Sequence, residues 1–148
     1  MQQQKIPLIK HPALKNVAQP PQAGIRSQQR ISRQSKLFKS IIEGIFDKKG
    51  EEVISLDLRK IQESVADFFI ICQASSSTQV KAIADSIEHK VQEATGEFPY
   101  RQEGFQHAKW VLVDYVNVVI HIMQPETRAF YQLEEMWSDA PAQLHHPS

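Results

Sequence analysis

The chain has 148 residues, a length typical of one domain of ordinary size. It carries 17 Lys and Arg against 17 Asp and Glu, and Cys72 is its only cysteine, which excludes a disulfide framework and a cysteine-based zinc site. No apolar run approaches the roughly 20 residues of a membrane span, and no secretory leader opens the sequence. We therefore expect a soluble intracellular protein.

The zero net charge conceals a strong asymmetry along the chain. Residues 1–42 contain eight Lys or Arg and no acid, which leaves nine bases against 17 acids and a net charge of −8 in the remainder. This split predicts a basic arm on an acidic body. We expect the body to be repelled by RNA phosphates and attracted to a basic protein surface, whereas the arm can touch RNA without reading its sequence.

Composition divides the chain into three parts. Residues 1–34 are rich in Gln, Pro and basic residues and are predicted to be a disordered arm, residues 35–140 to be the folded domain, and residues 141–148 to be a flexible tail. The arm also resembles a mitochondrial transit peptide, although its four prolines interrupt any long amphipathic helix. The expected location is the cytoplasm, with the mitochondrial matrix as the alternative.

Hydrophobic periodicity predicts the elements of the domain. In chain order we expect a helix over 37–48, strands over 53–58 and 68–73, a helix that starts in the serine cluster 75–78 and ends at 95–96, an extended segment over 100–103, a hairpin over 110–123, and a helix with Pro125 in its first turn that runs to about Trp137. This order, αββαβββα, predicts an α+β fold with a mixed sheet of about five strands flanked by helices.

Three features invite a chemical interpretation, and each has a structural one. Cys72 ends an apolar strand and is expected to be buried rather than nucleophilic. His121 alternates with apolar residues, and with Asp114 as the only acid nearby in the hairpin it is expected to be structural rather than a metal ligand. The serines before the second helix are expected to serve as N-caps, because no Asp-x-Asp pair exists to hold catalytic metals. We predict no catalysis, metal or cofactor.

Large aromatic residues are the remaining candidates for function. Trp137, with Phe130 and Leu133 at helical spacing, is predicted to lie in the core. Trp110 and Tyr115 bracket one strand at positions of opposite parity, so at least one of them is expected to point away from the core. An exposed aromatic beside charged residues is typical of a protein interface.

The order of residues from Glu103 to Ala140, EG…WVLVDY.NVVIHIM….R.FY.LE..W.DA, resembles the ribosomal silencing factor family, also called Iojap. The resemblance covers about residues 37–140 and implies a fold similar to the nucleotidyltransferase scaffold. It implies that the chain binds large-subunit ribosomal protein L-fourteen, blocks association of the small and large subunits, and represses translation when nutrients are limiting. It implies no enzymatic activity and no cofactor.

Given this resemblance, the predicted partner-binding residues lie in and around the hairpin. The anchors are Trp110, Tyr115 and Asn117, the polar contacts are Arg101, Glu103 and Asp114, and the residues of the last helix are Arg128 and Tyr131, which are equally suited to fixing that helix to the sheet. The partner is expected to be a ribosomal protein, with a weak ribosomal RNA contact through the arm, no membrane contact, and a homodimer as an option for the free protein.

One position departs from the family pattern. The family usually has Gly-Asp in the hairpin turn, whereas this chain has Val116–Asn117. A positive φ is costly for a β-branched residue, so we expect a type II-like or longer loop in which Asn117 alone takes that conformation. Two rival functions remain open: a factor for large-subunit assembly, and a nucleotide-binding enzyme on the transferase-like scaffold.

Overall fold

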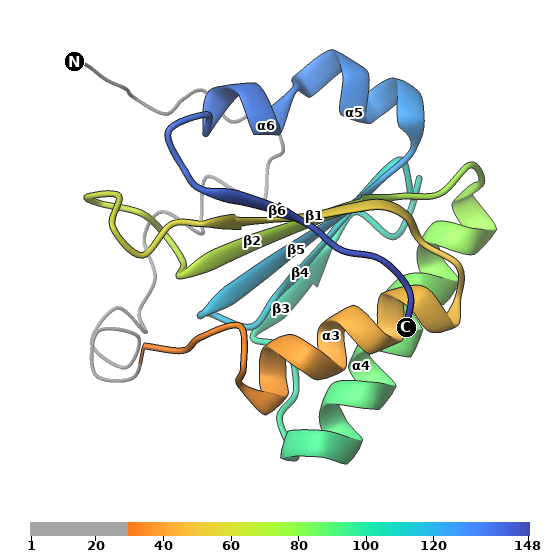
Figure 1. The fold of residues 1–148 in the computed structure, drawn as a ribbon. Coiled ribbons are helices and arrows are strands. Elements are labelled where there is room, and N and C mark those ends of the chain that lie inside the picture. Colours follow the sequence, from red (N-terminus) through yellow and green to blue (C-terminus); the bar gives the residue numbers. More distant parts are fainter. Residues whose placement is uncertain (1–29) are drawn as a thin grey trace.

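Ten helices and strands build the part of the chain that the computed structural model describes, residues 30–148. They are α3 (Lys36–Asp47), β1 (Glu51–Asp57), β2 (Phe68–Gln73), α4 (Ser77–Thr95), β3 (Arg101–Glu103), β4 (Trp110–Asp114), β5 (Val118–Met123), α5 (Pro125–Tyr131), α6 (Leu133–Met136) and β6 (Ala142–Leu144). The predicted mixed sheet flanked by helices is confirmed, with six strands in place of about five (Figure 1). No described helix is long and apolar enough to cross a membrane.

The centre of the sheet is a parallel pair. The strand order is β3-β4-β5-β2-β1-β6, and β2 runs parallel to β5 with Phe68 opposite Val118, while every other pairing is antiparallel. All six residues of β5 are buried, as are the first five of β2. Strands with helices on both faces need apolar side chains on both faces, which accounts for the continuous apolar runs in the sequence.

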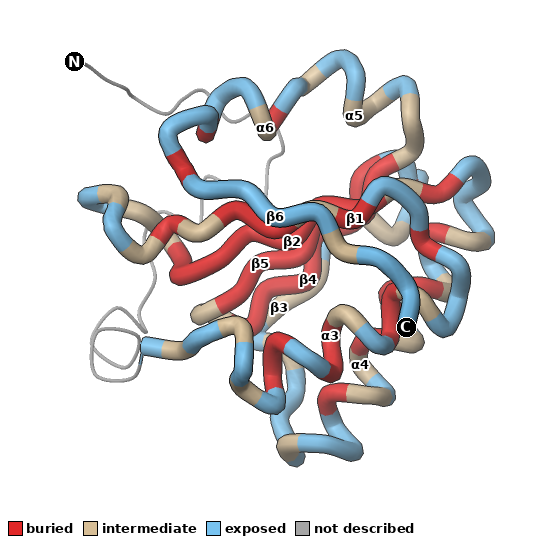
Figure 2. The backbone as a smooth tube through the Cα atoms, in the orientation of Figure 1, coloured by how far each residue is buried: buried red, intermediate tan, exposed pale blue. Residues whose placement is uncertain are grey.

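Alternation along the strands divides the core into two layers. Phe68, Ile70 and Cys72 of β2 face α3 and α4, whereas Phe69 and Ile71 of the same strand face α5 and α6. Figure 2 shows the buried strands between these two helical layers. The sheet therefore offers no broad open face to a partner.

Serine side chains begin both long helices. Ser35 Oγ accepts a hydrogen bond from Phe38 N at the start of α3, and Ser76 Oγ accepts one from Gln79 N at the start of α4. Gly96 ends α4 in the left-handed region at φ 78°. The expected N-cap role of the serine cluster and the expected end of this helix are confirmed.

The two long helices approach each other closely at a glycine. A Cβ atom on Gly44 of α3 would lie 2.9 Å from the Cα atom of Ile87 in α4. Beside this contact, Ser86 Oγ donates a hydrogen bond to the Gly44 carbonyl oxygen at 2.8 Å. The absence of a side chain at position 44 therefore sets the distance between the helices.

The last predicted helix is interrupted, which corrects the expectation of one continuous helix to Trp137. Gln132 takes a left-handed conformation at φ 48° and separates α5 from α6. The break changes which side chains face inward: Leu133 and Trp137 are buried as predicted, but Phe130 is 77% exposed. Placing Phe130 in the core was wrong, because helical spacing does not continue across the break.

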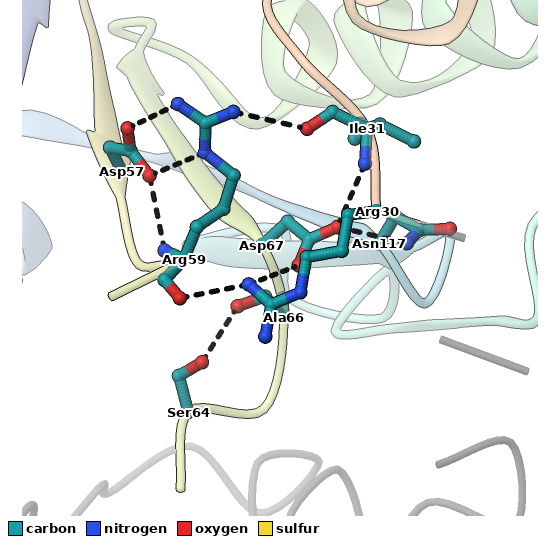
Figure 3. Close-up of polar contacts among 8 residues, drawn as sticks. All are labelled: Arg30, Ile31, Asp57, Arg59, Ser64, Ala66, Asp67 and Asn117. Atoms are coloured by element: carbon teal, nitrogen blue, oxygen red, sulfur yellow. Dashed lines mark hydrogen bonds and ion pairs between the residues drawn. The ribbon is translucent and has the colours of Figure 1, made fainter. Parts of the chain in front are cut away.

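Both ends of the predicted domain also differ from expectation. The expected flexible tail contains β6, which pairs with β1, and His145 Nε2 lies 2.8 Å from Ser55 Oγ. The predicted disordered arm over 1–34 falls largely outside the described residues, but Ile31 N donates a hydrogen bond to Asp67 Oδ2 (Figure 3). These contacts form between segments far apart in the sequence, so local composition did not reveal them.

The hairpin turn reverses the expected roles of its two residues. Asn117 N donates to the Tyr115 carbonyl oxygen at 2.8 Å, which makes Val116 the middle of a three-residue turn with φ 73°. The Asn117 carbonyl oxygen is held by the N–H groups of Asp67 and Phe68. Because the start of β2 fixes Asn117, the positive φ falls on the β-branched residue instead.

Replacing Val116 by Gly should therefore stabilise the protein. The left-handed region costs an L-residue about 1–2 kcal/mol, and the greater freedom of Gly in the unfolded chain offsets about 0.5–1 kcal/mol of that gain. We expect Val116→Gly to raise the free energy of unfolding by roughly 0.5–1 kcal/mol in urea titrations. Val116→Ala, which keeps a Cβ atom, should gain less, and a loss of stability in Val116→Gly would contradict the strained turn.

Replacing Gly44 by Ala should have the opposite effect. A methyl group at this position must push α3 away from α4, and the resulting misfit should exceed the gain in helix propensity. We expect Gly44→Ala to lower the free energy of unfolding by about 1–2 kcal/mol, measured by chemical denaturation. Lys39→Ala, on an exposed position of the same helix, serves as the control and should change stability by less than about 0.5 kcal/mol.

Candidate protein-binding surface

Four of the predicted site residues share one face of the sheet. Arg101 pairs with Asp114 and Glu103 pairs with Leu112 across β3 and β4, and directly paired residues point to the same side. Trp110 has the same parity as Leu112 and Asp114, so Arg101, Glu103, Trp110 and Asp114 all face the α5 and α6 layer. The structure thus places four of the eight predicted site residues on one face of the sheet.

An ion pair joins the two strands at the end of this face. Arg101 Nε lies 3.5 Å from Asp114 Oδ2, and Asp114 Oδ1 accepts a hydrogen bond from Val116 N at 2.8 Å. Burial raises the pKa of the Asp114 carboxyl above its usual value, and the Val116 N–H and the Arg101 guanidinium oppose this rise without cancelling it. Asp114 therefore supports the turn and positions Arg101.

Trp110 is not an exposed anchor. Only 6% of it is exposed, its ring lies 4.9 Å from that of Tyr131, and its Nε1–H donates a hydrogen bond to His121 Nδ1 at 3.0 Å. His121 is fully buried and also contacts the ring of Phe69, which confirms its structural role. Like Trp137, Trp110 belongs to the core, because Tyr131 of α5 packs over it at the first residue of β4.

Tyr115 lies on the opposite face of the sheet and is 4% exposed. Its side chain belongs to the layer under α3 and α4, and burial, followed by the negative charges of Glu88 and Glu97, raises the pKa of its hydroxyl. The expectation that Trp110 or Tyr115 points away from the core was wrong. The two side chains do lie on opposite faces of the sheet, but helices cover both faces.

Asn117 and Arg128 each fix one connection of the fold. Asn117 Nδ2 donates to Asp67 Oδ2 at 3.0 Å, beside the Ile31 contact that holds residue 31 against the sheet (Figure 3). Arg128 forms an ion pair with Glu134, with 2.6 Å between Arg128 Nη2 and Glu134 Oε2, and donates to the Glu52 carbonyl oxygen at the bulge of β1. Of the two roles expected for Arg128, the contacts favour fixing α5 and α6 to the sheet.

Two exposed aromatic residues lie in the segment that leads into β3. Phe98 is 65% exposed and Tyr100 is 43% exposed, and the Arg101 guanidinium carbon lies 5.6 Å from the centre of the Tyr100 ring. Sequence reasoning missed Phe98. The signal was available, because Gly96 ends the helix and Pro99 prevents its extension, so Phe98 falls in a connecting segment with no apolar periodicity.

Strand β3 itself has one free edge. It is the last strand in the sheet order and pairs only with β4, so its second edge is open in the described part of the chain. Acidic residues surround it: Glu97 and Glu103 are exposed, and Glu88 of α4 accepts a hydrogen bond from Gln102 Nε2 at 3.1 Å. We call Phe98, Tyr100, β3 and these acids the β3 surface.

The other chemical candidates have structural roles. Among residues 30–148, no group of three or more His, Cys, Asp or Glu is arranged to hold a metal ion. Cys72 is fully buried, and burial raises the pKa of its thiol to about 12, which keeps the sulfur protonated. The expected buried cysteine is confirmed.

Comparisons with known proteins identify the family. Residues 31–147 match the sequence model of the family described as ribosomal silencing factor during starvation. The chain is 41% identical over 106 residues to ribosomal silencing factor RsfS of Halalkalibacterium halodurans, covering 72% of this chain and 89% of that protein. It is 40% identical over 108 residues to RsfS of Bacillus subtilis, covering 73% and 90%.

Solved structures agree with this assignment. A crystal structure of a protein from Chromobacterium violaceum is 35% identical and superposes with a TM-score of 0.67, covering 80% of this chain and 92% of that one. A second, from Bacillus halodurans, is 38% identical with a TM-score of 0.62, covering 72% and 95%. The fold and the sequence together define a ribosome-associated translation regulator, and the chain belongs to the ribosomal silencing factor family.

The raised pKa of Asp114 predicts a pH dependence of stability. A carboxyl whose pKa is higher in the folded state than in the unfolded state favours folding below the unfolded pKa and loses that contribution as the pH rises through the folded pKa. Asp114→Asn keeps an acceptor for the Val116 N–H and removes the titration. The free energy of unfolding of this variant minus that of the wild type should therefore be larger at about pH 7 than at about pH 4 in denaturant titrations. The same difference at both pH values would contradict the assignment.

Proposed function

We propose that this protein binds large-subunit ribosomal protein L-fourteen through the β3 surface and thereby blocks association of the small and large ribosomal subunits. The single observation that supports this most is the open edge of β3 with Phe98 and Tyr100 exposed beside it. Family membership supplies the ribosomal context. Repression of translation under starvation follows from the block.

Each part of the β3 surface has a physical use in binding. An open strand edge offers unpaired backbone N–H and C=O groups to an extended segment of a partner. Exposed aromatic side chains supply large contact areas and are frequent among the residues that dominate binding energy. Acidic side chains around them speed association with a basic protein. Of the predicted site residues, Arg101 and Glu103 belong to this surface, and Asp114 positions Arg101 within it.

Silencing by this route needs occupancy and no chemistry. The bound protein fills space that the other subunit requires, so inhibition depends on affinity and concentration rather than on turnover. No cofactor, metal or catalytic residue enters the mechanism. We place the action in the cytoplasm, where ribosomal subunits join; cleavage of an N-terminal segment on import would place it in the mitochondrial matrix instead.

The β3 surface can be tested with aromatic variants that spare the core. Phe98→Ala and Tyr100→Ala should each weaken binding to purified L-fourteen by about tenfold or more, because each removes an exposed anchor. Phe130→Ala is the matched control, since Phe130 is also an exposed aromatic but lies on α5. Binding is measured by titration calorimetry, and thermal unfolding verifies the fold of each variant.

Sedimentation with ribosomal subunits tests the consequence. Wild-type protein should sediment with large subunits and reduce the formation of joined ribosomes when small subunits are added, whereas the Phe98→Ala, Tyr100→Ala double variant should do neither. Equal loss in the Phe130→Ala control would exclude the β3 surface as the interface. Binding to immature particles alone would replace silencing by a role in large-subunit assembly.

A further inference from the structure

A groove lies at the opposite edge of the sheet from β3. It has a volume of about 1010 Å³ and runs along α3, between that helix and the C-terminal segment that follows β6. Residues 32–34 and Arg59 line it at the start of α3, where His145 packs against Phe38. Lys39, Glu43 and Asp47 line it in this order along the helix, one turn apart. Sequence order and charge thus give the groove a basic end and an acidic end.

The two ends of the groove differ in how closely their charges are paired. Lys90 Nζ of α4 lies 3.0 Å from Asp47 Oδ2 and 3.9 Å from Glu43 Oε2, so a cation already accompanies the acidic end. Arg33 and Lys39 form no hydrogen bond or ion pair with an acid within residues 30–148. An anion in the groove would therefore find its complement beside these two side chains.

Packing holds Arg33 in place at this end. Its guanidinium carbon lies 5.4 Å from the centre of the Phe68 ring, and its Nε atom is buried without a hydrogen-bond partner. The neighbouring Arg59 also lies over Phe68, at 5.0 Å, but its charge is occupied by a two-point ion pair with Asp57, at 2.9 and 2.8 Å. Packing thus positions the Arg33 guanidinium, and its terminal Nη groups, which form no hydrogen bond within residues 30–148, are the donors left for a ligand.

His145 lies beside Arg33 in the wall of the groove. Burial, followed by the positive charges of Arg33 and His146, lowers the pKa of His145. His145 is held by Ser55 and packs against the Phe38 ring at 5.7 Å, so it forms a wall of the groove rather than a mobile tail. Along α3, the half-buried Ile42 and Phe46 offer an apolar surface on which a ribose can pack.

We propose that the basic end of this groove binds backbone phosphates of RNA through Arg33 and Lys39. Arginine and lysine are the usual phosphate ligands, and contacts to the backbone require no particular base sequence. An RNA ligand fits a member of a ribosome-associated family better than an acidic protein segment does, because ribosomal surfaces expose phosphates. The groove and the β3 surface lie at opposite edges of the sheet, so the two contacts do not compete.

The salt dependence of RNA binding tests the proposal. The full chain is titrated into a fluorescein-labelled RNA hairpin at several salt concentrations, and anisotropy gives the affinity. Removing two phosphate contacts in Arg33→Gln, Lys39→Gln should reduce the slope of log affinity against log salt by about 1.5 and weaken binding about tenfold or more near 0.1 M salt. The matched control is Lys81→Gln, Lys109→Gln, which removes the same charge from exposed positions elsewhere.

Three comparisons decide the outcome. The control pair should retain the wild-type slope within a few tenths, and Arg33→Lys should retain most of the affinity because it keeps the charge. Equal losses in both double variants would reduce the effect to net charge and overturn the proposal. Unchanged RNA binding in Arg33→Gln, Lys39→Gln would also overturn it and would leave the groove to an acidic protein segment. L-fourteen takes no part in this assay, so its result is independent of the interface proposed above.

Discussion

The fold depends on the burial of the sheet on both faces. The parallel pair β2 and β5 lies at its centre, and nearly every side chain of these strands is buried in one of two layers. Each buried apolar side chain contributes about 1.5–3 kcal/mol, so this pair anchors the helices around it. Polar residues in the centre are tolerated only with partners, as His121 is with Trp110.

This constraint moves recognition to the borders of the sheet. With both faces covered, the exposed aromatics lie in connecting segments or on α5, and the open backbone lies at the free edge of β3. At the other border, β6 covers β1, and the C-terminal segment forms a groove with α3. The acidic β3 surface and the basic end of the groove suit different ligands. A protein contact at one edge and an RNA contact at the other would fix the orientation of the bound factor.

The Val116–Asn117 turn illustrates how such a fold adapts to a local departure. A carboxylate at position 117 would face the buried carboxylate of Asp67. The Asn117 amide donates a hydrogen bond there instead, at 3.0 Å. Val116 accepts the positive φ that results, which costs about 1–2 kcal/mol and is offset by contacts of the turn with Asp114 and the start of β2.

The sequence by itself determined the order of the main elements, the two-sided burial of β2, the N-cap of α4, and the opposite parity of Trp110 and Tyr115. These follow from local periodicity and capping. Tertiary structure decided that both aromatics are buried, that Gln132 interrupts the last helix, and that the tail adds β6. Exposure depends on which elements cover a residue, and that covering is a long-range property that periodicity does not contain.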